Sequence, residues 1–176
     1  RSLILSTIFT YYSNYVYFNQ IASPSQSDNN LFYSKIELEK TWQIKNFIIN
    51  SAGLIQYTSD EKIISVPLFL ISQSLSYDKL IFNDIRLLSL LKIRLFSKYY
   101  IPSYFPLLDV FYQQQQYKSG MIPLASLNLS LYKKYFSFGI IVDNINSIFY
   151  KGEALVQDYI LPPTNLRIAI KWQFVD

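Results

Sequence analysis

Glu37 and Glu39 are a pair of acidic residues whose spacing could support acid–base chemistry. On an extended strand, residues two apart share a face and lie about 7 Å from each other. Paired carboxyl groups at such separations act as acid and base in glycosidases. Lys35 shares the same face, however, and we interpret the three side chains as mutually balancing charges on a wall. No catalytic residue is predicted, and the chain is not expected to be an enzyme.

The residue types that most other active sites need are missing. The chain contains no His and no Cys, so Ser-His-Asp and Cys-His sites are impossible and a zinc site is not expected. It has only four Gly, and Lys118-Ser119-Gly120 lacks the upstream glycines of a phosphate-binding loop. We therefore expect no metal and no cofactor.

Composition points to a membrane protein without membrane-spanning helices. The 176 residues, enough for one domain (1–176), are 51% hydrophobic, 18% aromatic and 16% charged, against about 25% charged in soluble domains. No run of about 18 apolar residues exists, as a transmembrane helix would require. Hydrophobicity spread over every second residue is typical of a transmembrane β-barrel. The net charge of +4 comes from scattered basic residues, so no nucleic-acid partner is expected.

The last segment, Leu166 to Asp176, alternates most clearly. One parity is apolar, comprising Leu166, Ile168, Ile170, Trp172 and Phe174. The other carries Arg167, Ala169, Lys171 and Gln173. Successive side chains of a strand point to opposite faces, so this segment predicts one lipid-facing and one lumen-facing side.

Seven upstream segments predict further strands, which makes about eight in an antiparallel up-and-down barrel. They are Leu3–Asn19, with Tyr11, Tyr12, Tyr15, Tyr17 and Phe18 as an aromatic girdle, then Leu31–Gln43, Phe47–Thr58, Ile64–Phe82, Leu87–Tyr99, Pro123–Tyr132 and Tyr135–Asn144. Gly53 marks a natural place for a bulge or bend. Short turns are expected near residues 45, 85 and 133, the last at Lys133–Lys134, and longer irregular loops near 25, 60, 110 and 155. This alternation matches the short periplasmic turns and long extracellular loops of outer-membrane barrels.

The strand parities predict the residues on each side of the wall. The pore-lining set is Lys35, Glu37, Glu39, Lys92, Arg94, Asn128, Asp143, Arg167 and Lys171. The lipid-facing set is Leu127, Leu129, Phe138, Ile140, Ile168, Ile170, Trp172 and Phe174. The charges could bias passage toward small polar or anionic solutes, or they could form an ion-pair network that only stiffens the barrel. Gly139, on the polar parity, would save space in the lumen.

Several short stretches, in this order and spacing, resemble a known family. They are Tyr15-Val16-Tyr17-Phe18-Asn19 followed by Pro24 and Gln26, Ile55-Gln56-Tyr57 leading to Val66-Pro67-Leu68, Arg94 to Lys98-Tyr99-Tyr100 with Tyr104 and Pro106, Gly120 with Pro123, and Ile170 to Asp176. From Tyr15 onward the chain resembles the C-terminal part of the putative porin family of outer-membrane β-barrels in Bacteroidetes-type bacteria. Ala169, Lys171 and Ser126 depart from the usual residues of that family.

The resemblance implies a location in the bacterial outer membrane and passive diffusion of small polar solutes. It also implies a larger barrel of which this chain would supply the last strands, and the start at Arg1 is interpreted as that of a fragment or mature C-terminal portion. Eight strands can also close alone. The expected partners are outer-membrane lipid and small polar solutes, with a homo-oligomer or an envelope protein also open. Two alternatives remain, namely a non-channel barrel that serves as a scaffold and a soluble all-β binding module.

Overall fold

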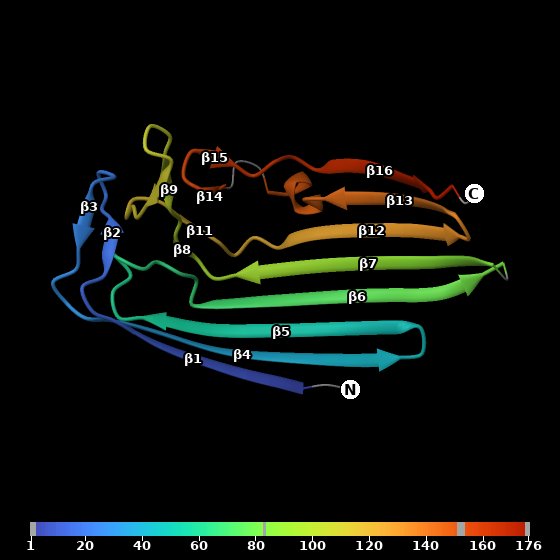
Figure 1. Cartoon of the computed structure of the whole chain (residues 1–176), viewed down its shortest axis with the longest axis horizontal. Coiled ribbons are helices and arrows are strands. Elements are labelled where there is room, and N and C mark those ends of the chain that lie inside the picture. Colours follow the sequence, from blue (N-terminus) through green and yellow to red (C-terminus); the bar gives the residue numbers. More distant parts are fainter. Residues whose placement is uncertain (1–2, 83, 151–153, 175–176) are drawn as a thin grey trace.

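A large antiparallel sheet dominates the computed structural model, which describes residues 3–82, 84–150 and 154–174 (Figure 1). Its eight strands are β1 (Leu3–Tyr12), β4 (Leu31–Ile44), β5 (Phe47–Thr58), β6 (Phe69–Ile81), β7 (Ile85–Phe96), β12 (Leu124–Lys133), β13 (Phe136–Asp143) and β16 (Asn165–Trp172). Each pairs with the next in that order, which confirms the all-β, up-and-down antiparallel prediction. Among the described residues β1 and β16 are unpaired edges, so the sheet is open.

Connections of two very different lengths alternate along the sheet. Those from β4 to β5, β6 to β7 and β12 to β13 are short and lie together at one end, on the right in Figure 1. The other four gather at the opposite end and comprise residues 13–30, 59–68, 97–123, and 144–150 with 154–164. We call these four long connections the cap. The predicted alternation of short and long connections is confirmed.

Two of the short turns contain only two residues and begin with a lysine at positive φ. Ile44 pairs with Phe47 around Lys45, whose φ is 51°, and Lys133 pairs with Phe136 around Lys134, whose φ is 43°. Tight hairpin loops need positive φ, usually supplied by Gly or Asn. The second turn is therefore Lys134–Tyr135, one residue later than predicted, because Lys133 still belongs to the ladder.

The first predicted strand was too long. The chain leaves the sheet after Tyr12, and Val16–Phe18 (β2) pairs instead with Pro24–Gln26 (β3) in the cap. The expected girdle residues Tyr15, Tyr17 and Phe18 therefore lie in the cap rather than on the sheet. The chain turns in this region before it returns as β4.

Other strand boundaries also differ from the prediction, and two of them have a local reason. β6 begins at Phe69 rather than Ile64, since Pro67 has no N–H to give to a ladder and its carbonyl accepts a hydrogen bond from Gln56 Nε2 (2.7 Å). β7 ends at Phe96 rather than Tyr99, and the Ser97 hydroxyl accepts the Phe69 N–H at 3.2 Å. The pairing runs through Gly53 without the expected bulge. β16 ends at Trp172, and positions 175–176 of its predicted range lie outside the described residues.

The cap contains small hairpins of its own where the sequence predicted irregular loops. Besides β2–β3 these are β8 (Tyr99–Tyr100) with β11 (Lys118–Ser119), β9 (Ser103–Phe105) with β10 (Val110–Tyr112), and β14 (Ala154–Val156) with β15 (Tyr159–Ile160), together with a short 3₁₀ helix, η1 (Ile145–Ile148). Backbone hydrogen bonds join three connections into one layer, from Gln113 N–H to the Phe18 carbonyl (3.4 Å) and from Gln157 N–H to the Pro102 carbonyl (2.9 Å).

The buried side chains of the described residues lie in the cap and at the strand ends that meet it. The apolar ones are Ala22, Leu31, Phe96, Ile101, Ile122 and Ala154. Along the rest of the sheet only Gly139 is buried, and a Cβ there would lie 3.3 Å from the Ser130 hydroxyl. The core thus sits at one end of the sheet rather than on either of its faces. In the described chain, no helix has the length and apolar character to span a membrane.

Candidate functional site: the two faces of the sheet

The pairing register assigns each strand residue to one of two faces, because direct partners in neighbouring strands point the same way. One row of partners crosses seven strands and is apolar throughout, running Trp42, Ile49, Leu75, Leu91, Leu127, Val142 and Leu166. The adjacent row on the other side is polar and runs Thr41, Asn50, Ser74, Lys92 and Ser126. We call these the apolar face and the polar face.

Side chains on the polar face bond to one another across strands. Thr41 Oγ1 donates to Asn50 Oδ1 at 2.9 Å, and Asn50 Nδ2 donates to Ser74 Oγ at 3.3 Å. Ser130 Oγ donates to Asn128 Oδ1 at 2.9 Å. The serines of β6, at positions 72, 74 and 76, belong to this face, and the sequence prediction missed them although they alternate regularly. The polar face thus carries hydrogen bonds within and between strands, alongside some apolar side chains such as Leu88 and Leu90.

The register places all nine residues predicted to line a pore on the polar face. Lys35 Nζ lies 2.8 Å from Glu37 Oε2, so the predicted charge balance at this pair is present. Arg167 pairs with Asp143, and a further pair, Arg86 with Asp78, was not predicted.

Four charged residues of the polar face have no ion-pair partner among the described residues. They are Glu39, Lys92, Arg94 and Lys171. Lys92 and Arg94 line a hollow of about 240 Å³ together with Ser126 and Asp143. When the three ion pairs are set aside, the remaining net charge on the polar face is positive.

The apolar face is uncovered. Seven of the eight predicted lipid-facing residues lie on it, and the eighth, Phe174, follows β16 with its ring stacked on that of Trp172 at 6.1 Å. Ile168 and Ile170 are 63% and 66% exposed. Contiguous apolar surface of this kind marks a protein or membrane contact in a folded protein.

Aromatic side chains border the apolar face at both ends. The group near the short turns is Trp42, Phe47, Tyr77, Phe136, Phe138 and Trp172, and the group near the cap is Phe9, Tyr11, Phe32, Tyr57 and Phe69. Rings touch within each group, as in Phe47–Tyr77 (4.7 Å) and Tyr11–Phe32 (5.1 Å). Between the groups this face is mostly aliphatic.

The distance between the two aromatic groups fits the thickness of a membrane. Phe32 and Trp42 stand ten residues apart on β4, which is about 33 Å along a strand. A strand tilt of about 40° reduces this to about 25 Å, the height of the apolar band of outer-membrane barrels. Aromatic belts at both borders of such a band are typical of membrane–water interfaces.

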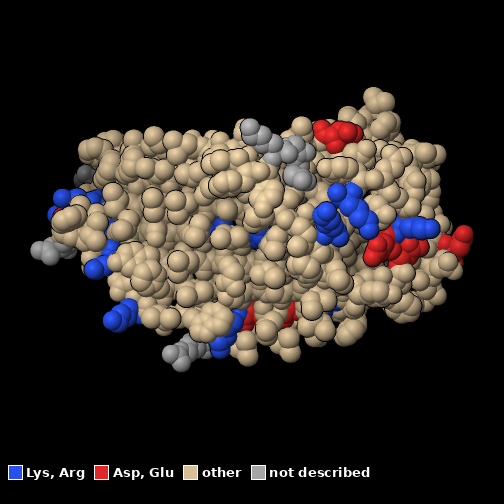
Figure 2. Space-filling model, turned by 180° about the vertical axis from the view of Figure 1, so that it is seen from behind, with Lys and Arg blue, Asp and Glu red and all other residues tan. Residues whose placement is uncertain are grey.

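Charged residues on the apolar face keep to one end. On its strands they are Lys40, Lys79 and Lys133, all within five residues of a short turn. Figure 2 shows the molecule from behind, with charged side chains at the end of the short turns and over the cap, and others between them at the lower edge and as small basic spots near the centre.

Up-and-down order, a hydrogen-bonding polar face and an apolar face bordered by aromatic rings define an amphipathic antiparallel β-sheet protein, the class from which transmembrane pores are built. The chain belongs to the family described as "Putative porin", whose model matches residues 2–176. The comparisons with curated proteins and with solved structures gave no match.

Proposed function

We propose that this sheet forms part of the wall of an outer-membrane β-barrel through which small polar solutes diffuse passively. The uncovered apolar face with its two aromatic borders carries the proposal, because that face would be unfavourable in water and suits a lipid bilayer. Family membership supports the same location. In this arrangement the polar face meets an aqueous lumen, the short turns lie in the periplasm and the cap lies outside the cell.

A membrane location requires partners for the two edges of the sheet. Unpaired backbone groups in hydrocarbon cost several kcal/mol each, so β1 and β16 must pair with each other or with further strands. An eight-stranded closure leaves an interior just wide enough for side chains. A channel wide enough for passive diffusion therefore requires a larger barrel, to which these eight strands contribute.

The proposed lumen favours anions. After the three ion pairs of the polar face are set aside, Lys92, Arg94 and Lys171 stand against Glu39. Lys92 and Arg94 lie next to Ser74 and Ser72 on β6, whose hydroxyls can also donate to an anion. Charged residues that line a pore bias the ions that pass.

The full-length protein in planar bilayers under a KCl gradient tests both parts of the proposal. We expect stepwise conductance and a reversal potential that favours chloride. The double variant Lys92→Gln/Arg94→Gln should lower the chloride preference about two-fold or more. Arg86→Gln, whose residue is already paired with Asp78, is the matched control and should change it less.

A second candidate is a barrel without a channel that serves as a scaffold, and the ion pairs across the polar face favour it because they would stiffen a filled interior. Correctly folded, heat-modifiable protein that never conducts would support this candidate and contradict the pore.

A further inference from the structure

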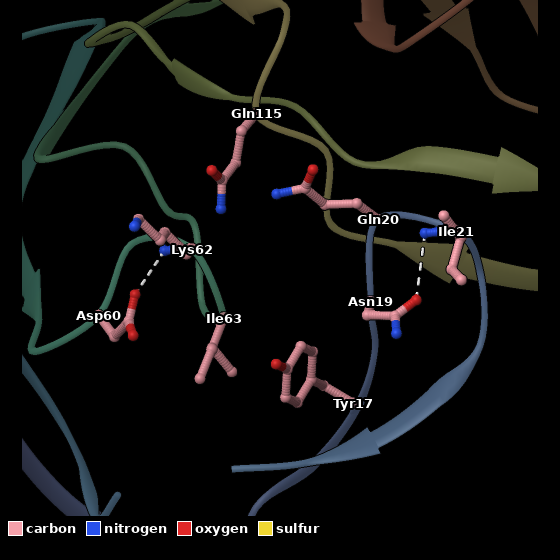
Figure 3. Close-up of a pocket in the computed structure, with 8 residues that line it drawn as sticks. All are labelled: Tyr17, Asn19, Gln20, Ile21, Asp60, Lys62, Ile63 and Gln115. Carbon is pink, nitrogen blue, oxygen red and sulfur yellow. Dashed lines mark hydrogen bonds between the residues drawn. The ribbon is translucent and has the colours of Figure 1, made fainter. Parts of the chain in front are cut away.

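A hollow of about 460 Å³ lies within the cap, away from both faces of the sheet. Three connections form it (Figure 3). Tyr17 and Gln20 come from the connection that precedes β4, Ile63 from that between β5 and β6, and Gln115 from that between β7 and β12. Its volume falls within the usual range for small-molecule sites, about 300–1,000 Å³.

Hydrogen bonds hold the walls of this hollow in place. Asn19 Oδ1 accepts the N–H groups of Ile21 and Ser23, both at 3.1 Å, and Asn19 Nδ2 donates to Ser25 Oγ at 2.8 Å. On the opposite wall, Asp60 Oδ1 accepts the Lys62 N–H at 2.8 Å.

Gln114 fixes the backbone that presents Gln115. Its Nε2 donates to the carbonyls of Ile101 and Tyr117, and its Oε1 accepts the N–H groups of Gln116 and Tyr117 at 2.7 Å. Gln114 is only 6% exposed, so this anchor is part of the core of the cap. A ligand would therefore meet a largely preformed site.

The side chains that face the hollow have unused hydrogen-bonding capacity. Among the described residues, the hydrogen bonds of the cap engage none of the polar side-chain atoms of Tyr17, Gln20 or Gln115. Figure 3 shows both glutamine amides directed into the hollow, with the Tyr17 ring and Ile63 beneath them. The Lys62 side chain extends away from the centre in the same view.

This set of groups selects for a neutral polyhydroxylated ligand. Each amide and the phenol can both donate and accept hydrogen bonds, as sugar hydroxyls also can. A purely apolar ligand would displace water from these groups without replacing its hydrogen bonds. The two charged residues of the lining, Asp60 and Lys62, have opposite signs, so the hollow has no net charge to attract an anion or a cation. We propose that the hollow binds a neutral saccharide of one or two rings, independently of whether the sheet encloses a channel.

Saturation-transfer NMR on the full-length protein in detergent tests the proposal. The neutral probes are maltose, cellobiose, lactose and N-acetylglucosamine, and gluconate is the anionic probe. We expect at least one neutral sugar to bind and gluconate to bind at least about ten-fold more weakly. Gln20→Ala/Gln115→Ala should weaken sugar binding by about ten-fold or more.

Gln116→Ala is the matched control, because Gln116 is exposed next to Gln115 and lies outside the hollow. It should leave binding unchanged, and trypsin digestion should show the same cap fragments in all variants. The proposal is overturned if protein with an intact cap binds no neutral sugar. It is equally overturned if gluconate binds as well as the sugars do, or if the double variant binds them as the unaltered protein does.

Discussion

The cap and the sheet use the same residue types in opposite ways. Ile101 in the cap is completely buried, whereas Ile170 in β16 is 66% exposed. In the cap, the amide nitrogen and oxygen of Gln114 both form hydrogen bonds with backbone groups. On the sheet, Lys92 and Arg94 have no ion-pair partner among the described residues. The cap is stabilised by burial within the chain itself. The apolar face of the sheet must take its stabilisation from its surroundings.

Shortening the same side chain in both regions should produce the largest contrast. Ile101→Ala leaves a cavity in a packed core and should cost about 2–5 kcal/mol. Ile170→Ala leaves no cavity if lipid chains fill the space, and should cost about 1–2 kcal/mol. Tryptic cleavage at Lys98 and Lys118 in vesicle-bound protein reports on the cap. Equal acceleration of cleavage by the two variants would remove the distinction between the regions.

A charge on either side of one strand sharpens the contrast between the two faces. Leu129→Arg places a cation on the apolar face of β12, which should cost about 2–4 kcal/mol near the middle of a bilayer. Asn128→Arg, one residue away on the polar face, should be close to neutral. Denaturant titration of protein refolded into vesicles measures both changes. Similar losses in the two variants would show that the faces do not meet different media.

The Gln114 anchor should contribute less to the stability of the cap than the apolar core of the cap does. Gln114→Ala leaves the Ile101 and Tyr117 carbonyls and two N–H groups without their partner, which should cost about 1–3 kcal/mol. Gln116→Ala, at an exposed neighbouring position, should change stability by less than about 0.5 kcal/mol. The same tryptic assay compares them, and a harmless Gln114→Ala would mean that solvent replaces these bonds.

The smallest expected effect is a response of the cap to alkaline pH. Burial raises the pKa of Tyr99 above 10.0, and the hydrogen bond to Asp109 raises the pKa of Tyr104. A raised pKa in the folded state means that stability is complete below about pH 10 and falls as pH rises beyond it. Absorbance titration at alkaline pH should show the late-titrating component diminished in Tyr99→Phe. An unchanged titration curve would contradict the assignment.

The sheet could be predicted from the sequence far better than the cap. β5 was predicted to the residue, because strict alternation is a local signal that survives in any strand with two unlike faces. The same alternation grouped Lys92, Asn128 and Arg167, which the register places on one face. The cap depends on contacts between distant segments, and the run of glutamines at 113–116 gives no local sign that Gln114 is buried.

The aromatic borders were predicted only in part for the same reason. The predicted strand Leu3–Asn19 suggested a girdle from its clustered tyrosines, yet most of the bordering rings come from other strands and align only through the register. The partners of the β1 and β16 edges are likewise not encoded in the alternation of either strand.

Cysteine labelling along β12 tests most directly whether the two faces meet lipid and water. The chain has no Cys, so single cysteines at positions 126 to 130 can each be probed with a membrane-impermeant maleimide in vesicles. The account predicts that positions 126, 128 and 130 are labelled and that positions 127 and 129 are protected until the membrane is dissolved in detergent and the protein is unfolded in denaturant. Labelling of all five positions, or protection of the even-numbered ones, would contradict it.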